Sequence, residues 1–101
     1  MRISIVNPFK KIFEGNAQEI ILPGEDGEVA VLDFHQPFLY CLTKGFITVK
    51  EHIFQQKQST AVVTKQGNSR IMIKRGVALM QGNEVLVLVE TDIKETETND
   101  A

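Results

Sequence analysis

The chain has 101 residues, 43% of them hydrophobic, and a formal net charge of −2. This length suits one domain and the apolar fraction is sufficient for a core, so we expect a single folded domain rather than two domains or a disordered chain. The Lys and Arg residues are scattered, and the slightly negative total provides no field that would gather nucleic acid.

The only cysteine in the sequence is Cys41, which excludes an internal disulfide and any CxxC zinc or redox site. Its neighbours in FLYCL are apolar, so we expect a buried, unreactive thiol. No run approaches the ~18 apolar residues of a membrane-spanning helix, and the opening MRISIVNPF lacks the pattern of a secretory signal. We therefore expect a soluble chain in a reducing compartment, with no direct insertion into a membrane.

Short segments rich in Val, Ile and Thr alternate with Gly, Asn and Pro along the chain. Such spacing is typical of an antiparallel sandwich or barrel, and no stretch of adequate length keeps a helical apolar period. We predict an all-β fold, an antiparallel β-sandwich of about ten strands. In chain order the predicted strands are residues 3–6, 12–14, 19–22, 29–32, 38–42, 46–50, 60–64, 70–74, 77–81 and 85–90.

The turn after the third predicted strand reads LPGEDGEV. Pro23 fixes its own φ ahead of Gly24, and Asp26-Gly27 is a strong turn dipeptide, so we expect a rigid, projecting loop. Paired carboxylates could serve acid–base chemistry, but nothing in the sequence indicates that they are buried, and a solvated acidic loop is the stronger interpretation. The loop also lacks the GxxxxGK[ST] pattern that binds phosphate. Its acidic residues are Glu25, Asp26 and Glu28.

A second constrained corner, His35-Gln36-Pro37, follows the next predicted strand. Two stiff corners on adjoining segments favour a docking edge rather than a reaction site. The two histidines, His35 and His52, do not combine with Glu28 or Cys41 in any recurring metal-ligand spacing, and no serine lies in a GxSxG turn. The sequence therefore predicts no metal site, no cofactor and no enzyme.

The last predicted strands contain more apolar residues than one buried face needs. Residues 82–90, GNEVLVLVE, begin with a tight turn and continue with alternating valines and leucines, so the three valines face one way and the two leucines the other. Residues 77–80 and 38–42 show the same excess. Leaving such side chains in water would forgo roughly 1.5–3 kcal/mol each. Either a partner covers the outer face, or the sheet curls into a barrel whose corner strands change sheets.

Residues 1–92 are therefore the predicted β-sandwich domain. Residues 93–101 contain acids and one large apolar residue, Ile93, and are expected to form a flexible acidic tail.

The run ILPGEDGEVAVLDFHQPFLYCLTKG, residues 21–45, resembles the LPG-x-x-GE-x-GVLP-x-H-x-P…L-x-PG block of the epsilon subunit of F-type rotary ATP synthases. Residues 6–15 resemble the opening V-x-P…x-F-x-G of that family, and residues 76–88 resemble its closing GF-L-x-V…N-x-V-T-V-L. The resemblance covers residues 1–49 and 70–92. It implies the family's N-terminal β-sandwich, which has no active site.

The same resemblance implies a non-catalytic central-stalk subunit that couples rotation of the gamma subunit to the membrane rotor ring in proton-driven ATP synthesis. The protein would be peripheral, on the cytoplasmic face of a bacterial inner membrane or its organelle equivalent. By position, Glu25, Asp26 and Glu28 would face the polar loops of the ring. His35 would lie near the junction of gamma and ring, although a surface histidine bonded to a backbone group remains open. The expected gamma contacts are His35, Pro37, Leu79 and Met80.

The chain departs from the family in three places. Ala30 replaces the usual glycine and Asp33 the usual proline, so we expect the loop to differ in shape. An insertion is expected within 45–76, as an extended hairpin or an extra strand pair. The family's two C-terminal helices have no counterpart in the sequence, so we expect no nucleotide site. The main alternative is a free-standing β-sandwich adaptor or regulator that binds through residues 50–68, and a metal-dependent barrel enzyme is the third.

Overall fold

The structure, a computed structural model, describes residues 1–56 and 62–91, with side chains for 1–51 and 68–91. These ranges contain nine strands and no helix, which confirms the all-β prediction. The predicted tail at 93–101 lies outside the described residues. The strands are β1 (Arg2–Val6), β2 (Lys11–Asn16), β3 (Glu19–Gly24), β4 (Gly27–Leu32), β5 (Phe38–Leu42), β6 (Gly45–Gln56), β7 (Val62–Ile73), β8 (Arg75–Gln81) and β9 (Glu84–Glu90).

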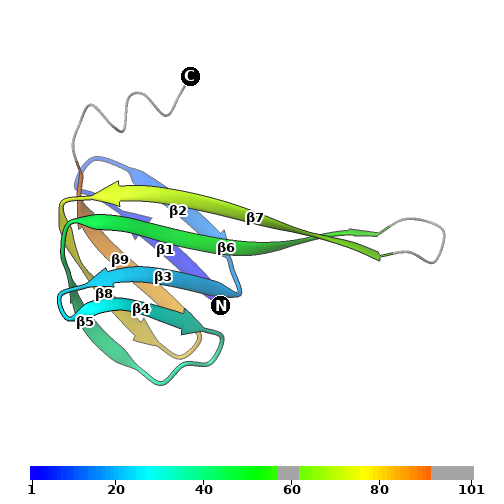
Figure 1. Cartoon of the computed structure of the whole chain (residues 1–101), viewed down its shortest axis with the longest axis horizontal. Coiled ribbons are helices and arrows are strands. Elements are labelled where there is room, and N and C mark those ends of the chain that lie inside the picture. Colours follow the sequence, from blue (N-terminus) through cyan, green and yellow to red (C-terminus); the bar gives the residue numbers. More distant parts are fainter. Residues whose placement is uncertain (57–61, 92–101) are drawn as a thin grey trace.

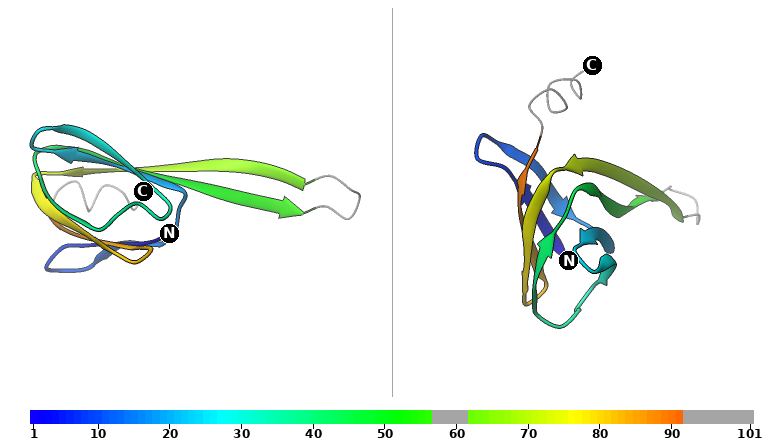
Figure 2. Two further views of the ribbon diagram at one scale, coloured as in Figure 1. Left: turned by 90° about the horizontal axis from the view of Figure 1, so that it is seen from below. Right: turned by 60° about the vertical axis from the view of Figure 1, so that its left-hand side comes forward.

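Hydrogen bonds join the strands in the order β2-β1-β9-β8-β5-β3-β6-β7, with β4 paired to β3. β5 and β3 meet at a single pair, Gly24 with Leu42, so the sheet folds over at this point. One layer then contains β2, β1, β9, β8 and β5, and the other contains β4, β3, β6 and β7 (Figures 1 and 2). Neighbouring strands are antiparallel except β1 and β9, which run parallel. The result is the predicted sandwich.

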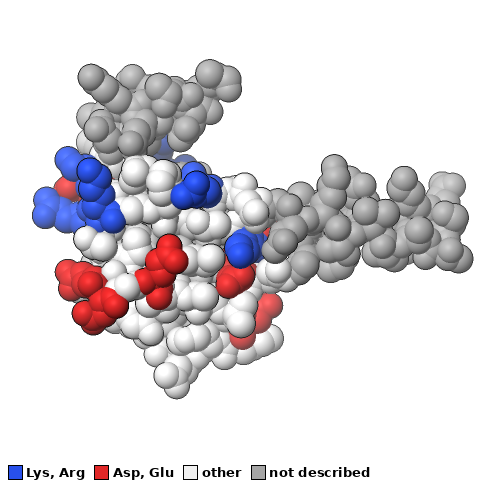
Figure 3. Space-filling view, in the orientation of Figure 1, with Lys and Arg blue, Asp and Glu red and all other residues white. Residues whose placement is uncertain are grey.

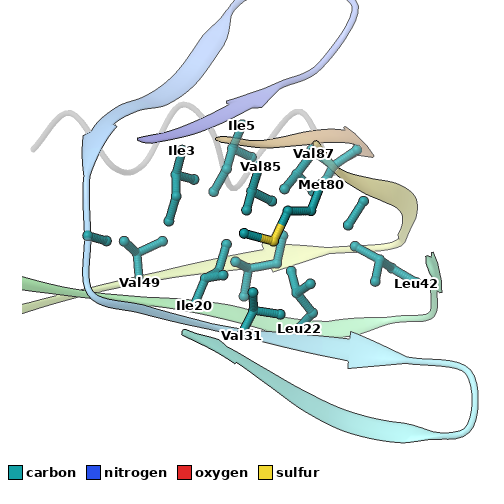
Figure 4. Packing of buried hydrophobic residues seen from close by; sticks show 14 of the residues in the cluster. Ile3, Ile5, Ile20, Leu22, Val31, Leu42, Val49, Met80, Val85 and Val87 are labelled. Atoms are coloured by element: carbon teal, nitrogen blue, oxygen red, sulfur yellow. The ribbon is translucent and has the colours of Figure 1, made fainter. Parts of the chain in front are cut away.

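The core lies between the two layers (Figure 4). On β9 the side chains of Val85, Val87 and Val89 are buried, whereas those of Leu86 and Leu88 are exposed, as the alternation in the sequence predicts. Burying a side chain of this size contributes roughly 1.5–3 kcal/mol, so both layers are held by apolar packing. The largest fully buried side chains are Ile3, Ile5, Ile20, Leu22, Val31, Ile47, Val49, Ile73, Met80, Val85 and Val87.

The segment after β5 forms a long hairpin. β6 and β7 stay paired without a register shift over the twelve residues of each strand, and their outer half extends beyond the sandwich as an arm (Figure 1). The prediction of separate strands at 60–64 and 70–74 is wrong, because one strand, β7, runs without a break from residue 62 to residue 73 and joins the two predicted ranges. Of the two forms expected for this segment, the structure shows the extended hairpin.

Candidate functional site

The acidic turn between β3 and β4 is fixed by backbone contacts. Gly24 pairs with Gly27, whose φ of 124° suits a residue without a Cβ atom. The turn residues are Glu25 and Asp26, one position earlier than the predicted dipeptide, and Gly27 already begins β4. The N–H of Glu25 donates to the carbonyl of Cys41 at 3.2 Å. The turn is therefore supported by β5 and projects as a rigid loop.

Pro23 lies at the base of this turn, where it is buried and its carbonyl accepts the N–H of Thr43 at 2.8 Å. The side chains of Glu25, Asp26 and Glu28 are exposed. In the part of the chain that the structure describes, none of these three carboxylates forms an ion pair. Their charge is available to an external partner.

Basic side chains lie at the same end of the sandwich. Lys44 precedes β6, and Lys74 and Arg75 lie where β7 turns into β8. All three are exposed, and Arg75 Nε is 3.1 Å from a carboxylate oxygen of Glu90. Figure 3 shows Lys and Arg gathered above Asp and Glu at the left-hand end of the molecule. This end therefore presents both signs of charge side by side.

The β4–β5 loop, residues 33–37, lies at the other end of β4. The carboxylate of Asp33 forms an ion pair with the buried N-terminal amine of Met1. The N–H of Phe34 donates to the side-chain oxygen of Asn83, in the turn between β8 and β9, at 2.8 Å. The loop is thereby tied to the N-terminus and to a neighbouring turn.

His35 is half-buried in this loop. Its Nδ1 lies 2.8 Å from the carbonyl oxygen of Gln36, and its ring meets the ring of Phe38 edge-on at 5.4 Å. Phe38 in turn stacks on Tyr40 at 4.5 Å. The structure thus shows a surface histidine bonded to a backbone group, the arrangement that the sequence left open. Pro37, two residues after His35, is exposed.

The outer side of β5, β8 and β9 presents exposed apolar side chains in two rows. Leu39 pairs with Leu79 and Leu79 with Leu86, while Val77 pairs with Leu88 in the adjacent row. These five residues, called here the apolar face, are between 37% and 67% exposed. In the single chain the face is open to solvent rather than folded into a barrel.

Two predictions about side chains near this face are wrong. Met80 is fully buried, because it points to the opposite side of β8 from Leu79, so it contacts the core and not a partner. Cys41 is exposed, because its pairing with Val77 places it on the outer side of β5. An apolar neighbourhood in sequence does not bury a residue when the strand turns it outward.

The described side chains do not gather into a metal-binding cluster. Among them, no three of His, Cys, Asp and Glu lie close enough together to hold a metal ion. Within the described residues there is also no helix with the length and apolar character needed to cross a membrane.

Phe34 is the residue that the sequence reasoning missed. Its side chain is 81% exposed and its φ is 62°, in the left-handed region that bulky residues rarely adopt. Alternation of apolar and polar residues predicts which side chains are buried in a strand, but it does not predict the exposure of a loop residue such as Phe34. The available signal was a phenylalanine placed between two polar residues in a turn segment.

These features define a class of protein: a small β-sandwich with a charged turn at one end, a fixed loop at the other and an exposed apolar face on one layer. Over residues 1–95 the chain matches the family described as ATP synthase, Delta/Epsilon chain, beta-sandwich domain, and it belongs to this family. The predicted relationship, drawn from the LPGEDGE and HQP segments, is confirmed.

The relatives of this chain include proteins named ATP synthase epsilon chain. The protein of Herminiimonas arsenicoxydans is 26% identical over 101 residues, and the chloroplastic protein of Tetradesmus obliquus is 33% identical over the same length. In both cases the match covers 100% of this chain and 64% of the relative, so the chain spans less than two thirds of their length. The Rickettsia bellii protein is 29% identical and is covered to 84%.

Solved structures support the fold. A chain from the mitochondrial ATP synthase of Euglena gracilis superposes with a TM-score of 0.65 at 15% identity, covering 96% of this chain and 59% of that one. A chain from the central stalk and c-ring structure of the Tetrahymena thermophila enzyme gives 0.64 at 13% identity, covering 88% and 62%. Both superpositions include most of this chain.

Proposed function

We propose that this chain is the β-sandwich part of an epsilon-type central-stalk subunit, a non-catalytic protein that couples rotation of the gamma subunit to the membrane rotor ring. The observation that supports this most directly is the apolar face. Five large apolar side chains lie exposed in adjacent rows on a member of this family. Contiguous exposed apolar surface of this kind is typical of protein–protein contacts.

The two ends of the sandwich suggest how it is oriented. The apolar face and the neighbouring loop, with Leu79, His35 and Pro37, would contact gamma. The acidic turn, with Glu25, Asp26 and Glu28, would contact the polar loops of the ring, where exposed carboxylates can pair with basic groups. The protein would then be peripheral, on the cytoplasmic face of a bacterial inner membrane or at the equivalent position in an organelle.

Gel filtration with the purified gamma subunit of the same organism tests the proposal. We expect the two proteins to elute together as a stable complex. Separate elution at micromolar concentrations would argue against a central-stalk role. The same mixture at high salt separates apolar from ionic contributions, because screening weakens exposed ion pairs and leaves apolar burial intact.

The acidic turn provides a second test. Glu28→Lys reverses an exposed charge, so we expect normal folding but weaker coupling of ATP hydrolysis to proton pumping in a reconstituted complex. Glu51→Lys makes the same change on β6, away from the turn, and serves as the control. If proton pumping is equal in the two variants and in the unmodified complex, the acidic turn does not contribute to the contact with the ring.

A further inference from the structure

Phe34 combines two features that do not serve folding. Its φ of 62° makes it the one non-glycine residue with positive φ among residues 1–56 and 62–91. Its ring is 81% exposed, so the unfavourable backbone is not offset by burial of the side chain in the core. Residues held in such conformations cluster at binding sites, where the surrounding structure imposes them.

The backbone of Phe34 is held by contacts of both neighbouring residues, Asp33 and His35, and by a contact with the turn between β8 and β9. Asp33 is ion-paired with the N-terminal amine, and the N–H of His35 donates to the carbonyl of Leu32 at 3.2 Å. The N–H of Phe34 itself donates to Asn83 Oδ1 at 2.8 Å. The backbone that carries the ring is therefore held in one conformation before any partner arrives, which lowers the entropy lost on binding.

The chemistry around Phe34 indicates what the ring meets. Residues 34–43 contain no Lys, Arg, Asp or Glu, and the acid that directly precedes them, Asp33, is paired internally. Leu32 and Leu39, on the strands that flank the loop, are 57% and 67% exposed. In Figures 1 and 3 the loop forms the lower edge of the molecule, and that edge is largely uncharged. Such a surface fits an apolar pocket of a protein, and it lacks the basic groups that a nucleic acid or an anionic lipid surface requires.

The loop is also continuous with the apolar face. Leu39 begins the row that continues through Leu79 to Leu86, and β5 starts directly after the loop. A partner that covers the apolar face therefore reaches Phe34 at its edge.

We infer that Phe34 is a pre-positioned aromatic anchor that inserts into an apolar pocket of the protein covering the apolar face. This inference rests on the proposed function, in which that protein is gamma. Asn83 is a positioning residue, since it touches the backbone of Phe34 and not the partner.

The test measures the affinity of the full chain for purified gamma by titration calorimetry. Phe34→Ala is expected to weaken binding by about tenfold or more, the loss typical of an aromatic side chain buried in a pocket of the partner. Phe34→Gly, which suits the positive φ, is expected to weaken binding as much while the chain becomes no less stable. Phe9→Ala is the matched control, because Phe9 is also 81% exposed and lies in the turn between β1 and β2. It is expected to bind like the unmodified chain.

The possible outcomes distinguish failure of the Phe34 proposal from failure of the proposed function. If the unmodified chain binds gamma and Phe34→Ala binds equally well, the anchor is wrong and the central-stalk role stands. If Phe9→Ala and Phe34→Ala lose affinity equally, the effect is not specific to the loop and the anchor is also overturned. If the unmodified chain does not bind gamma, both proposals fail. Binding to vesicles of anionic lipid that is lost in Phe34→Ala would overturn the protein pocket in favour of a membrane surface.

Discussion

Glu14 is the residue at which charge stabilises the first hairpin. On β2, its carboxylate lies 2.8 Å from Lys11 Nζ and 2.9 Å from a guanidinium nitrogen of Arg2 on β1. The hydrogen bond from Lys11 and then that from Arg2 lower the pKa of Glu14 below its ordinary value of 4.5. Because β2 is an end strand of the sheet, these contacts secure an edge that has hydrogen-bonding partners on one side only.

The lowered pKa of Glu14 gives a pH prediction with a definite sign. A carboxyl group with a depressed folded-state pKa stabilises the fold above its unfolded pKa, and this contribution is lost as the pH falls through the folded pKa. We expect an NMR titration to give a midpoint below 4.5 for Glu14. Lys11→Met should raise it toward the ordinary value, and Arg2→Met should raise it less. A midpoint that does not respond to Lys11→Met would show that the pair is absent in solution.

Phe34 also shows, at the residue scale, where prediction from sequence stops. A left-handed backbone at a bulky residue costs roughly 1–2 kcal/mol, so local preference argues against it. The conformation depends on Asn83, far away in sequence, and on the ion pair of Asp33 with the N-terminus. Such contacts join residues that are distant in sequence and form only in the complete fold. A local sequence pattern therefore does not predict them.

At the scale of elements, β8 and β9 depend on a close approach at Gly76. A Cβ atom there would lie 2.5 Å from the carbonyl oxygen of Leu88 and 3.1 Å from Cγ1 of Val89, so the strands would have to move apart. We expect Gly76→Ala to lower the free energy of unfolding by about 1–3 kcal/mol, as overpacking does. The measurement is urea denaturation followed by circular dichroism.

Gly15→Ala on β2 is the control for Gly76. Its new methyl group would meet the ring of Phe13 at 3.5 Å, an ordinary contact, so the change in unfolding free energy should stay within about 0.5 kcal/mol. Equal midpoints for the two variants would mean that the β8–β9 contact is looser than the structure shows.

The elements also show how far the sequence predicts the candidate surfaces. Alternation located β9 and separated its valines from its leucines, because only one face of that strand is buried. It did not decide which of Leu79 and Met80 faces outward, since both are apolar and a strand pattern does not indicate which face the core takes. The break expected between the predicted strands at 60–64 and 70–74 is absent, because continuous pairing with β6 holds residues 65–69 extended.

At the scale of the whole molecule, the sandwich separates two kinds of surface. The charged turn lies at one end of β4, and the uncharged loop with Phe34 lies at the other, with the apolar face running from that loop along β5, β8 and β9. In the proposed role between gamma and the ring, this division would let each surface be complementary to one partner. The acidic turn was predicted from sequence because its residues are consecutive. The apolar face was predicted only as an excess of apolar residues, because its rows join strands distant in sequence.

The arm formed by β6 and β7 makes this chain less compact than a typical domain of its length. The radius of gyration, 14.6 Å, exceeds the ~13 Å expected for a compact domain of this length, as a projecting hairpin requires. The buried cluster among the described side chains is formed by the sandwich, and the outer half of the hairpin extends beyond it (Figure 1). The arm should therefore be removable without loss of the core.

Trimming the hairpin tests whether the arm or the sandwich binds the partner. His52 and Gln66 face each other across the ladder, so residues 53–65 can be replaced by Asn-Gly, a dipeptide that closes a two-residue hairpin. We expect the trimmed chain to unfold within a few degrees of the full chain and to elute with gamma as before, because the apolar face and the β4–β5 loop are unchanged. A substitution of the same residues by a Gly-Ser linker of equal length controls for chain length. If both variants fold but no longer bind, the chain acts through residues 50–68, as the adaptor hypothesis requires, and the apolar face must be covered in some other way.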